Sequence, residues 1–451
     1  MSLKINLKNG FDIKLKGSAV EEVSEYKSPS SYALKPTDFI GLSRPKLLIA
    51  EGDEVKSGTP VLFDKLNESV MYSSPVSGEV VEIVRGEKRR LEEIRILPDK
   101  VNKFLKFKKY KDSDISKLSK EEIINNLCDS GVWPNLIQRP FGMVADPKLL
   151  PKSIFISFFD TNPLSPNYSY VYAEDKEYIK IGIKIIKMLT DGKVHLNHNS
   201  DTFSDFSIDG CENNLFSGPH PSGNVGIQIH HIDPINKGDV VWTTTPQGLA
   251  EIGRLFIEGR YDTSRKICVV GSEVANPKFY KCNYGINVES IVKKENEDNC
   301  RVISGNVLTG NAIGYNGYLG FYDNMISVLP EGDNHSFLGW IMPLANKLSF
   351  QRAFGLLSFL KPKKNEYILD TNTNGELRAF VQTGIFEKVL PMDILPTFLF
   401  KAILANDYDE MEELGIYELI EEDIALCEFV DVSKNELQKL LRRGLNLLME
   451  D

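Results

Sequence analysis

Closely spaced cysteines are the first feature that this sequence lacks. Its 451 residues include six cysteines, and none of them forms a Cys-x-x-Cys pair. Zinc and iron–sulfur sites take most of their thiolate ligands from such pairs, so this scatter argues against both kinds of metal centre. We expect reduced, mostly buried thiols in an intracellular protein. The six are Cys128, Cys211, Cys268, Cys282, Cys300 and Cys427.

Long apolar runs and an excess of positive charge are also missing. The longest apolar stretches, such as residues 394–405, are shorter than the roughly 18–20 residues that a membrane-spanning helix needs. Residues 1–10 contain no apolar stretch of the secretory type, so we expect no leader. The net charge of −10 argues against a nucleic-acid partner. If the protein works at a membrane, we expect it to be peripheral.

Local signatures of a self-sufficient active site are absent as well. The sequence contains no G-x-x-x-x-G-K-[ST] phosphate loop, no G-x-S-x-G nucleophile turn and no H-E-x-x-H zinc helix. We therefore assign no catalytic residue and no metal ligand, and we expect the isolated chain not to be catalytic.

The first hundred residues are rich in strand and turn signals. Over 45–64 and 70–84, short apolar runs alternate with turn residues, which predicts a compact all-β unit. The arrangement resembles the barrel-sandwich hybrid of biotinyl and lipoyl carriers. A carrier needs a modifiable lysine at a hairpin tip, and Lys65 is the only candidate nearby. The carriers' flanking motifs are missing, so we interpret Lys65 as a surface lysine.

From residue 119 the pattern predicts alternating helices and strands. Ser119, followed three residues later by Glu122, begins a helical period that closes at Gly131, which is typical of a capped helix. The β-α-β order that follows predicts a parallel α/β sheet. The expected elements are a strand over 153–160, a helix over 176–189, strands over 193–199 and 223–232, and a helix over 245–260.

The last third of the chain divides into a strand-rich and a helix-rich part. Short strands return after residue 265, and from about residue 340 the pattern is mostly helical. Pro396 at a helix entry and Gly415 after a helix end support these boundaries. The expected helical segments are 348–360, 395–415 and 434–450.

The segment SGPHPSGNVGIQIHHI (217–232) is a candidate binding loop. Its histidines suggest zinc, but His230 and His231 are adjacent in a predicted strand and would point to opposite faces, so they cannot readily converge with His220. A dinucleotide loop follows a strand and opens a helix, whereas this loop precedes a predicted strand. We therefore expect structural, hydrogen-bonded histidines and no nucleotide cradle from these local features.

A second candidate is WPNLIQRPFG (133–142). An exposed loop that carries Trp133, Arg139 and Phe141 would suit a flat apolar ring with a polar edge, such as a quinone. The alternative is that Trp133 and Phe141 close a domain interface. Both interpretations stay open on the sequence alone.

Several segments, taken together and in order, resemble one family. The match runs from about residue 10 to the C-terminus. On these motifs the chain resembles the A subunit of the sodium-translocating NADH:quinone oxidoreductases. That family is related to the C subunit of the Rnf complex and to the flavin-binding subunit of respiratory complex I. The segments are EGDEVKSGTPVLF, SPVSGEVVEI, DSGVWPNLIQRPFG, DTNPLSP, FSGPHPSGNVGIQIHHI, RVISGNVLTG and LPMDILPT.

The resemblance implies a multidomain α/β and β fold. Its four domains would be a barrel-sandwich hybrid (1–112), a Rossmann-like α/β domain of the type found in the flavin-binding protein of complex I (113–262), a β-grasp, soluble ligand-binding domain (263–335) and a C-terminal, mainly helical domain (336–451). The relatives carry a glycine-rich cofactor loop in the α/β domain, and here Gly218, His220, Gly223 and Gly226 would be its vestige. Only Cys427 stands where the Rnf relative has cysteine runs, so we expect no iron–sulfur ligands.

The resemblance also implies a function. The chain would be a peripheral subunit that lies at the cytoplasmic face of the bacterial inner membrane, docked chiefly on the membrane-embedded B subunit. The complex passes electrons from NADH to ubiquinone or menaquinone and exports sodium. This chain would bind no cofactor, because the flavins and iron–sulfur centres lie in other subunits, but it would interact with quinone. The alternatives are an electron-transfer subunit of the Rnf type and a lipoyl- or biotinyl-like carrier.

Overall fold

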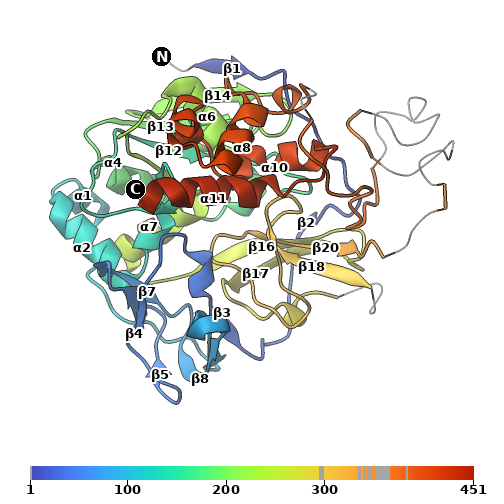
Figure 1. Cartoon of the computed structure of the whole chain (residues 1–451). Coiled ribbons are helices and arrows are strands. Elements are labelled where there is room, and N and C mark those ends of the chain that lie inside the picture. Colours follow the sequence, from blue (N-terminus) through green and yellow to red (C-terminus); the bar gives the residue numbers. More distant parts are fainter. Residues whose placement is uncertain are drawn as a thin grey trace.

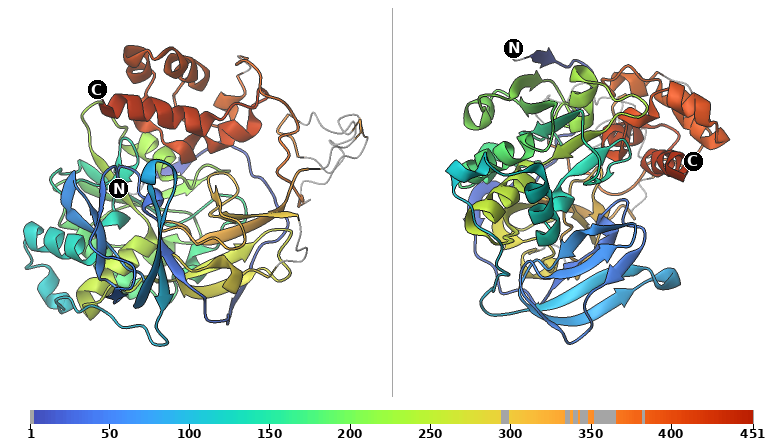
Figure 2. Two further views of the ribbon diagram at one scale, coloured as in Figure 1. Left: turned by 60° about the horizontal axis from the view of Figure 1, so that its bottom comes forward. Right: turned by 90° about the vertical axis from the view of Figure 1, so that its left-hand side faces the viewer.

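The protein is seen here as a computed structural model that describes residues 3–293, 299–333, 337–338, 342, 348–351, 366–381 and 384–450. Figure 1 shows the chain from its blue N-terminal strands to its red C-terminal helices. In the right-hand view of Figure 2, the N-terminus lies at the top, the blue strands of residues 32–98 lie at the bottom, and the C-terminal helices lie at the upper right. The helix predicted over 348–360 falls mostly on 352–360, outside the described residues.

The N-terminal β unit is built from two antiparallel sheets, with strand orders β3-β9-β8-β5 and β4-β6-β7. Val61, Leu62, Val80 and Ile94 are completely buried in it, and the predicted all-β unit is confirmed. Its elements are β3 (Tyr32–Leu34), β4 (Pro45–Leu47), β5 (Glu54–Val55), β6 (Pro60–Asp64), β7 (Asn67–Ser73), β8 (Gly78–Arg85) and β9 (Leu91–Pro98), with the turns η1 (Pro36–Asp38) and η2 (Glu87–Arg89).

The α/β sheet has the strand order β1-β14-β13-β12-β15-β10-β11. Strands β12 to β15 pair in parallel, and β10 pairs antiparallel with β15. Because β13 and β15 lie on opposite sides of β12, the order reverses there, and ligands of such sheets bind beyond the carboxyl ends of the strands near that point. The strands are β1 (Lys4–Asn6), β10 (Ile137–Arg139), β11 (Met143–Val144), β12 (Ser153–Ser157), β13 (Lys193–His198), β14 (Glu212–Ser217) and β15 (Val241–Thr244).

The helices around this sheet follow the local signals of the sequence. Ser119 caps α2 in a capping box with Glu122, and Gly131 ends it in the left-handed conformation, with φ of 83°. Gly182 of α4 and Gly253 of α7 allow these two helices to pack closely, because an added Cβ on Gly182 would lie 2.3 Å from the Leu249 carbonyl oxygen. The helices are α1 (Asp112–Ile115), α2 (Lys120–Ser130), η3 (Trp133–Asn135), α3 (Tyr168–Val171), α4 (Lys176–Lys187), α5 (Phe203–Phe206) and α7 (Pro246–Glu258).

The strand predicted over 223–232 is wrong. Residues Val225–Ile232 form helix α6, which begins after Asn224. Apolar residues at 225, 227 and 229 alternate as they would in a strand, but here the alternation occurs in a helix whose central residues are buried. Gly226, Ile227, Gln228 and Ile229 are all buried, because α6 is covered on more than one side. A short helix covered in this way does not show helical periodicity.

A third sheet has the order β19-β18-β20-β16-β17-β2. It includes β2 from the N-terminal segment, and strands β16 and β20 at its centre are parallel. The short strands predicted after residue 265 are therefore confirmed. The elements are β2 (Val20–Ser24), β16 (Ser264–Val270), β17 (Lys278–Asn283), η4 (Val288–Ser290), β18 (Cys300–Ser304), β19 (Asn311–Ala312) and β20 (Met325–Pro330).

From Phe386 onward the described C-terminal segment is mostly helical, and its helices pack against helix α6 and strand β14. Ile227 of α6 and Phe216 of β14 belong to the same apolar core as Phe400, Ile403 and Leu441 of the C-terminal helices. Figure 1 shows α11 running across the front of the molecule. The elements are η6 (Phe386–Lys388), α8 (Pro396–Ala405), α9 (Tyr408–Glu413), η7 (Ile416–Glu418), α10 (Glu421–Val430) and α11 (Leu437–Glu450).

The N-terminal segment up to residue 24 supplies strands to two sheets whose other strands come much later in the chain. Strand β1 pairs in parallel with β14, and β2 pairs in parallel with β17. Both strands therefore belong to sheets other than those of the N-terminal β unit. The four domain boundaries stay a prediction.

Candidate functional site

The loop between β14 and α6 lies at the carboxyl end of the parallel sheet. Its residues 218–224 follow a strand and open a helix, which is the order of a dinucleotide-binding turn. The sequence pattern excluded a nucleotide-binding loop because a strand was expected to follow it. That prediction is wrong, because a helix follows the loop. Whether this turn can bind a phosphate depends on the atoms that surround it.

The loop's glycines pack against the chain itself. Gly218 has φ of 138°, and a Cβ added there would lie 2.5 Å from the Leu7 carbonyl oxygen. A Cβ on Gly223 would lie 2.8 Å from the backbone nitrogen of Thr161. Glycine is therefore required here for contact with neighbouring backbone, whereas a phosphate loop needs glycine for contact with its ligand.

His220 is a structural residue of the loop. Its backbone N–H donates to Asp12 Oδ1 at 2.9 Å, and its Nδ1 lies 3.1 Å from Thr161 Oγ1. Burial lowers the pKa of the imidazole to about 4, so the ring is neutral at pH 7. The buried Nε2 has no hydrogen-bond partner among the described residues.

His230 and His231 lie on α6 and point to different partners. His230 Nδ1 lies 2.8 Å from Glu418 Oε2, and its Nε2 accepts a hydrogen bond from the backbone N–H of Asp393. His231 Nε2 donates to the carbonyl oxygen of Pro391 at 2.9 Å. In the described part of the chain, no group of three or more His, Cys, Asp or Glu side chains is arranged to hold a metal ion.

The start of α6 is occupied by an ion-pair cluster, which we call the Arg139 cluster: Arg139, Glu422 and Asp423. Arg139 Nη1 donates to Asp423 Oδ2 at 2.7 Å, and Nη2 donates to Glu422 Oε1 at 2.5 Å. A Cβ on Gly226 would lie 2.3 Å from Asp423 Oδ1 and 2.4 Å from Arg139 Nη1. Side chains of the chain itself thus fill the space beside the first turn of α6.

Arg139 and Asp423 form the buried part of the Arg139 cluster, whereas the side chain of Glu422 is 38% exposed. The side chains of Arg139 and Asp423 are 1% and 0% exposed. Burial raises the pKa of Asp423, and the adjacent guanidinium opposes this rise by favouring the carboxylate. The amide of Asn224 holds the cluster to the loop by donating to the Glu422 carbonyl oxygen at 2.8 Å. A buried pair of this kind depends on both partners being present.

The 133–142 loop is less accessible than its sequence suggests. Trp133 is 0% exposed, and its indole N–H donates to the Ala145 carbonyl oxygen at 2.7 Å. Its ring meets that of Trp242 edge-on, with 5.5 Å between the centroids. The predicted exposure is therefore wrong for Trp133 and Arg139. Phe141 is half-buried and meets the ring of Tyr417 edge-on at 5.9 Å.

The structure brings together only some of the predicted site residues. Gly226 meets Arg139, so the two candidate segments share one site at the start of α6. Glu422 and Asp423, which complete it, have no place in the sequence-based prediction. The signal that could have found them is the run of three acidic residues over 421–423 at the start of a helix. Acidic residues are favoured at a helix N-terminus, and they pair with cations.

The two N-terminal units match known domain types. The family model "NqrA N-terminal barrel-sandwich hybrid domain" matches residues 5–99, and "NqrA second alpha/beta domain" matches residues 118–261. A third model, "NQRA C-terminal domain", matches residues 266–314. The protein therefore belongs to a class in which a barrel-sandwich hybrid domain is followed by an α/β domain. This order agrees with the predicted order of the two units.

Curated relatives match over the full length. The chain is similar to the Na(+)-translocating NADH-quinone reductase A subunit of Histophilus somni strain 2336, with 36% identity over 99% of this chain and 100% of that protein. The proteins of the same name from Pasteurella multocida and Neisseria meningitidis serogroup B are 37% identical, with the same coverage. The chain belongs to this A-subunit family of the Na(+)-translocating NADH-quinone reductases. The predicted family, and with it the role as a subunit of an oxidoreductase complex, is confirmed.

A solved NAD+-reducing [NiFe]-hydrogenase in the air-oxidised state is only weakly similar in structure, with a TM-score of 0.34 and 11% identity over 51% of this chain and 52% of its own. Of the helices in the described ranges, none combines the length and apolar character needed to cross a bilayer.

Proposed function

We propose that this chain is a peripheral, cofactor-free subunit of a sodium-pumping NADH:quinone oxidoreductase, taking part in electron transfer to quinone that is coupled to Na+ export. Membership of the A-subunit family supports the complex. The Arg139 cluster carries the cofactor-free part of the proposal, because its side chains occupy the turn where an α/β domain of this order would hold a phosphate.

The finer fold assignments belong to the same proposal. We assign a Rossmann-like domain to 113–262 and a β-grasp domain to 263–335, on the support of the parallel sheet and of the mixed sheet around β16 and β20. The mainly helical domain, 336–451, contains Cys427 as its only cysteine. A [4Fe–4S] cluster takes about four thiolates, so this domain would lack iron–sulfur ligands.

Optical and metal analysis of the purified full-length chain tests the cofactor-free role. We expect no flavin absorbance and no iron, and stoichiometric flavin or iron would overturn the proposal. The same sample tests the Rnf-type alternative, because an electron-transfer subunit of that type would reduce a dye with NADH on its own. We expect no such reduction.

The quinone part of the proposal centres on Phe141. Trp133 and Arg139 are buried, so within the 133–142 loop they would support the position of Phe141, whose half-buried ring a quinone can reach. Replacing Phe141 by alanine should weaken the binding of a short-chain ubiquinone by about 1–2 kcal/mol, measured by tryptophan fluorescence. The matched control is Phe398→Ala, at a 41% exposed position on α8. Equal affinity for all three proteins would assign Phe141 to packing against Tyr417.

We further propose that the chain docks, at the cytoplasmic face, on the membrane-embedded B subunit. Co-expression tests this assignment: the chain should sediment with membranes when the B subunit is present and stay in the supernatant when it is not. Recovery in the supernatant under both conditions would contradict docking. The carrier alternative concerns Lys65, which is exposed between β6 and β7, and an unmodified intact mass from native cells would eliminate it.

A further inference from the structure

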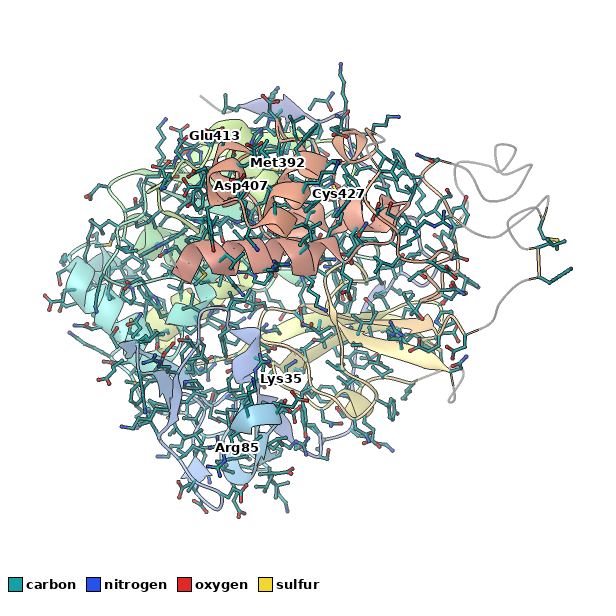
Figure 3. The ribbon with its side chains drawn as sticks, viewed as in Figure 1. Lys35, Arg85, Met392, Asp407, Glu413 and Cys427 are labelled. Atoms are coloured by element: carbon teal, nitrogen blue, oxygen red, sulfur yellow. The ribbon has the colours of Figure 1, made fainter. Side chains whose placement is uncertain are left out.

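A cavity of about 780 Å³ lies between the N-terminal β unit and helix α11. The N-terminal β unit contributes residues 36–47, the β6–β7 tip at Lys65 and the β8–β9 hairpin, and α11 contributes Arg442 and Asn446. Figure 3 labels Arg85 on the N-terminal β unit, below α11 in that view. The volume lies within the range of about 300–1,000 Å³ that small-molecule sites occupy.

The lining of this cavity is strongly cationic. Six basic side chains line it, and no carboxylate is among the lining residues. In a protein with a net charge of −10, such a concentration of one sign creates a local field that attracts anions. The six are Lys46, Lys65, Arg85, Arg89, Arg90 and Arg442.

Five of these cations have no ionic partner among the described residues. Arg442 pairs with Glu421 and donates to the Phe141 carbonyl oxygen at 2.7 Å. The other five make no ion pair with any residue that the structure describes. Lys46 lies over the ring of Phe63, at 5.4 Å from its centroid. Like charges held together without counterions repel one another, and a bound anion would relieve this repulsion.

The hairpin that carries three of the arginines closes in a tight turn. Lys88 and Arg89 are its two central residues, with φ of 52° and 62°, and the backbone N–H of Arg90 donates to the Glu87 carbonyl oxygen at 3.0 Å. The conformation holds Arg85, Arg89 and Arg90 at the rim of one cavity.

The cavity also has an apolar wall, which includes Phe39, Leu42 and Leu47. Guanidinium groups bind phosphate oxygens in a bidentate manner, and several arginines together favour a multiply charged phosphate. We propose that this cavity binds a phosphate-bearing organic anion, supplied either as a soluble nucleotide-like polyphosphate or as the headgroup of an anionic phospholipid. This inference does not depend on the quinone proposal.

The test uses the full-length chain and two kinds of probe at low ionic strength. Inorganic pyrophosphate and ATP, titrated by calorimetry, represent the soluble source. Phosphatidylcholine vesicles with and without phosphatidylglycerol, assayed by co-sedimentation, represent the lipid source. The triple variant Arg85→Gln/Arg89→Gln/Arg90→Gln removes the hairpin's charges at exposed positions. Its matched control is Lys56→Gln/Lys100→Gln/Lys106→Gln, which removes equal charge from exposed positions outside the cavity.

We expect the triple variant to bind its ligand at least about tenfold more weakly than the wild type, and the lysine control to retain affinity. Binding of pyrophosphate and ATP would identify the soluble source, and binding only to vesicles with phosphatidylglycerol would identify the lipid source. Failure of the wild type to bind any probe would overturn the proposal. So would an equal loss in both variants, because that result would reflect net charge alone.

Discussion

At the scale of single residues, the buried charges of Arg139 and Asp423 are tolerated only because each is paired with the other. Arg139 and Asp423 are separated by 284 positions in the chain and joined by a 2.7 Å hydrogen bond in a buried site. No local pattern connects two residues so distant, so the sequence could not predict the pair. Residues 133–142 and 217–232 were both recognisable as unusual, but not as parts of one cluster.

Removing Arg139 should strongly destabilise the fold. In Arg139→Ala, Asp423 would remain buried without its cation, which costs about 3–5 kcal/mol in the free energy of unfolding. Urea denaturation followed by circular dichroism measures the change. The double variant Arg139→Ala/Asp423→Ala should recover part of the loss, and the exposed Arg443→Ala should cost little. A loss below about 1 kcal/mol in the single variant would show that the cluster is not structurally important.

His220 should make stability depend on pH. Its pKa is lowered from 6.5 to about 4 in the folded chain, so the unfolded chain binds a proton that the folded chain excludes. The stability that the neutral ring contributes is present above pH 6.5 and is lost as the pH falls towards 4. The advantage of the wild type over His220→Gln should therefore shrink by up to about 3 kcal/mol over this interval. Parallel unfolding curves for the two proteins across this range would contradict the shift.

At the scale of elements, local signals predicted most helices and strands. Helix α2 begins and ends where Ser119, Glu122 and Gly131 indicate, because caps satisfy backbone groups through neighbours in sequence. Helix α6 was missed because burial on several sides hides its period. The error changed the interpretation of the adjoining loop, since the order of strand, loop and helix was the ground for excluding a nucleotide turn.

Helix α6 should not tolerate a side chain at Gly226. An alanine favours an isolated helix by about 1 kcal/mol over glycine, but here its Cβ would lie 2.3 Å from Asp423 Oδ1. We expect Gly226→Ala to lose about 1–3 kcal/mol of stability in thermal or urea unfolding. The control is Gly375→Ala, whose Cβ would meet only the flexible side chain of Lys434, at 3.2 Å. Unchanged or increased stability of Gly226→Ala would show that the Arg139 cluster can move aside.

At the scale of the whole molecule, the units share apolar cores rather than standing apart. One core extends from the N-terminal β unit through the α/β sheet to the third sheet, and a second joins α6 to the C-terminal helices. The sequence could indicate the kinds of units and their order, since these follow from periodicity. It could not indicate which surfaces the units bury against each other.

Thiol accessibility should report this shared packing. Cys128, Cys268, Cys282 and Cys427 are buried, and burial raises the pKa of Cys282 to about 12, so its reactive thiolate is scarce at neutral pH. A maleimide reagent should label only Cys211 and Cys300 in the native chain, and all six cysteines in urea. Mass spectrometry counts the labels. Rapid labelling of Cys427 in the native protein would show that the C-terminal helices separate from α6.

The pairing of β1 and β2 with distant strands has a consequence for biosynthesis. Leu3 and Asn214 are joined by a hydrogen bond across 211 positions, so the first segment to leave the ribosome has no partner until much of the protein has been translated. At about 5–20 residues per second, this delay lasts about 10–40 s. The nascent N-terminus must stay unpaired during that time, and β1 and β2 can join their sheets only after β14 and β17 have been translated.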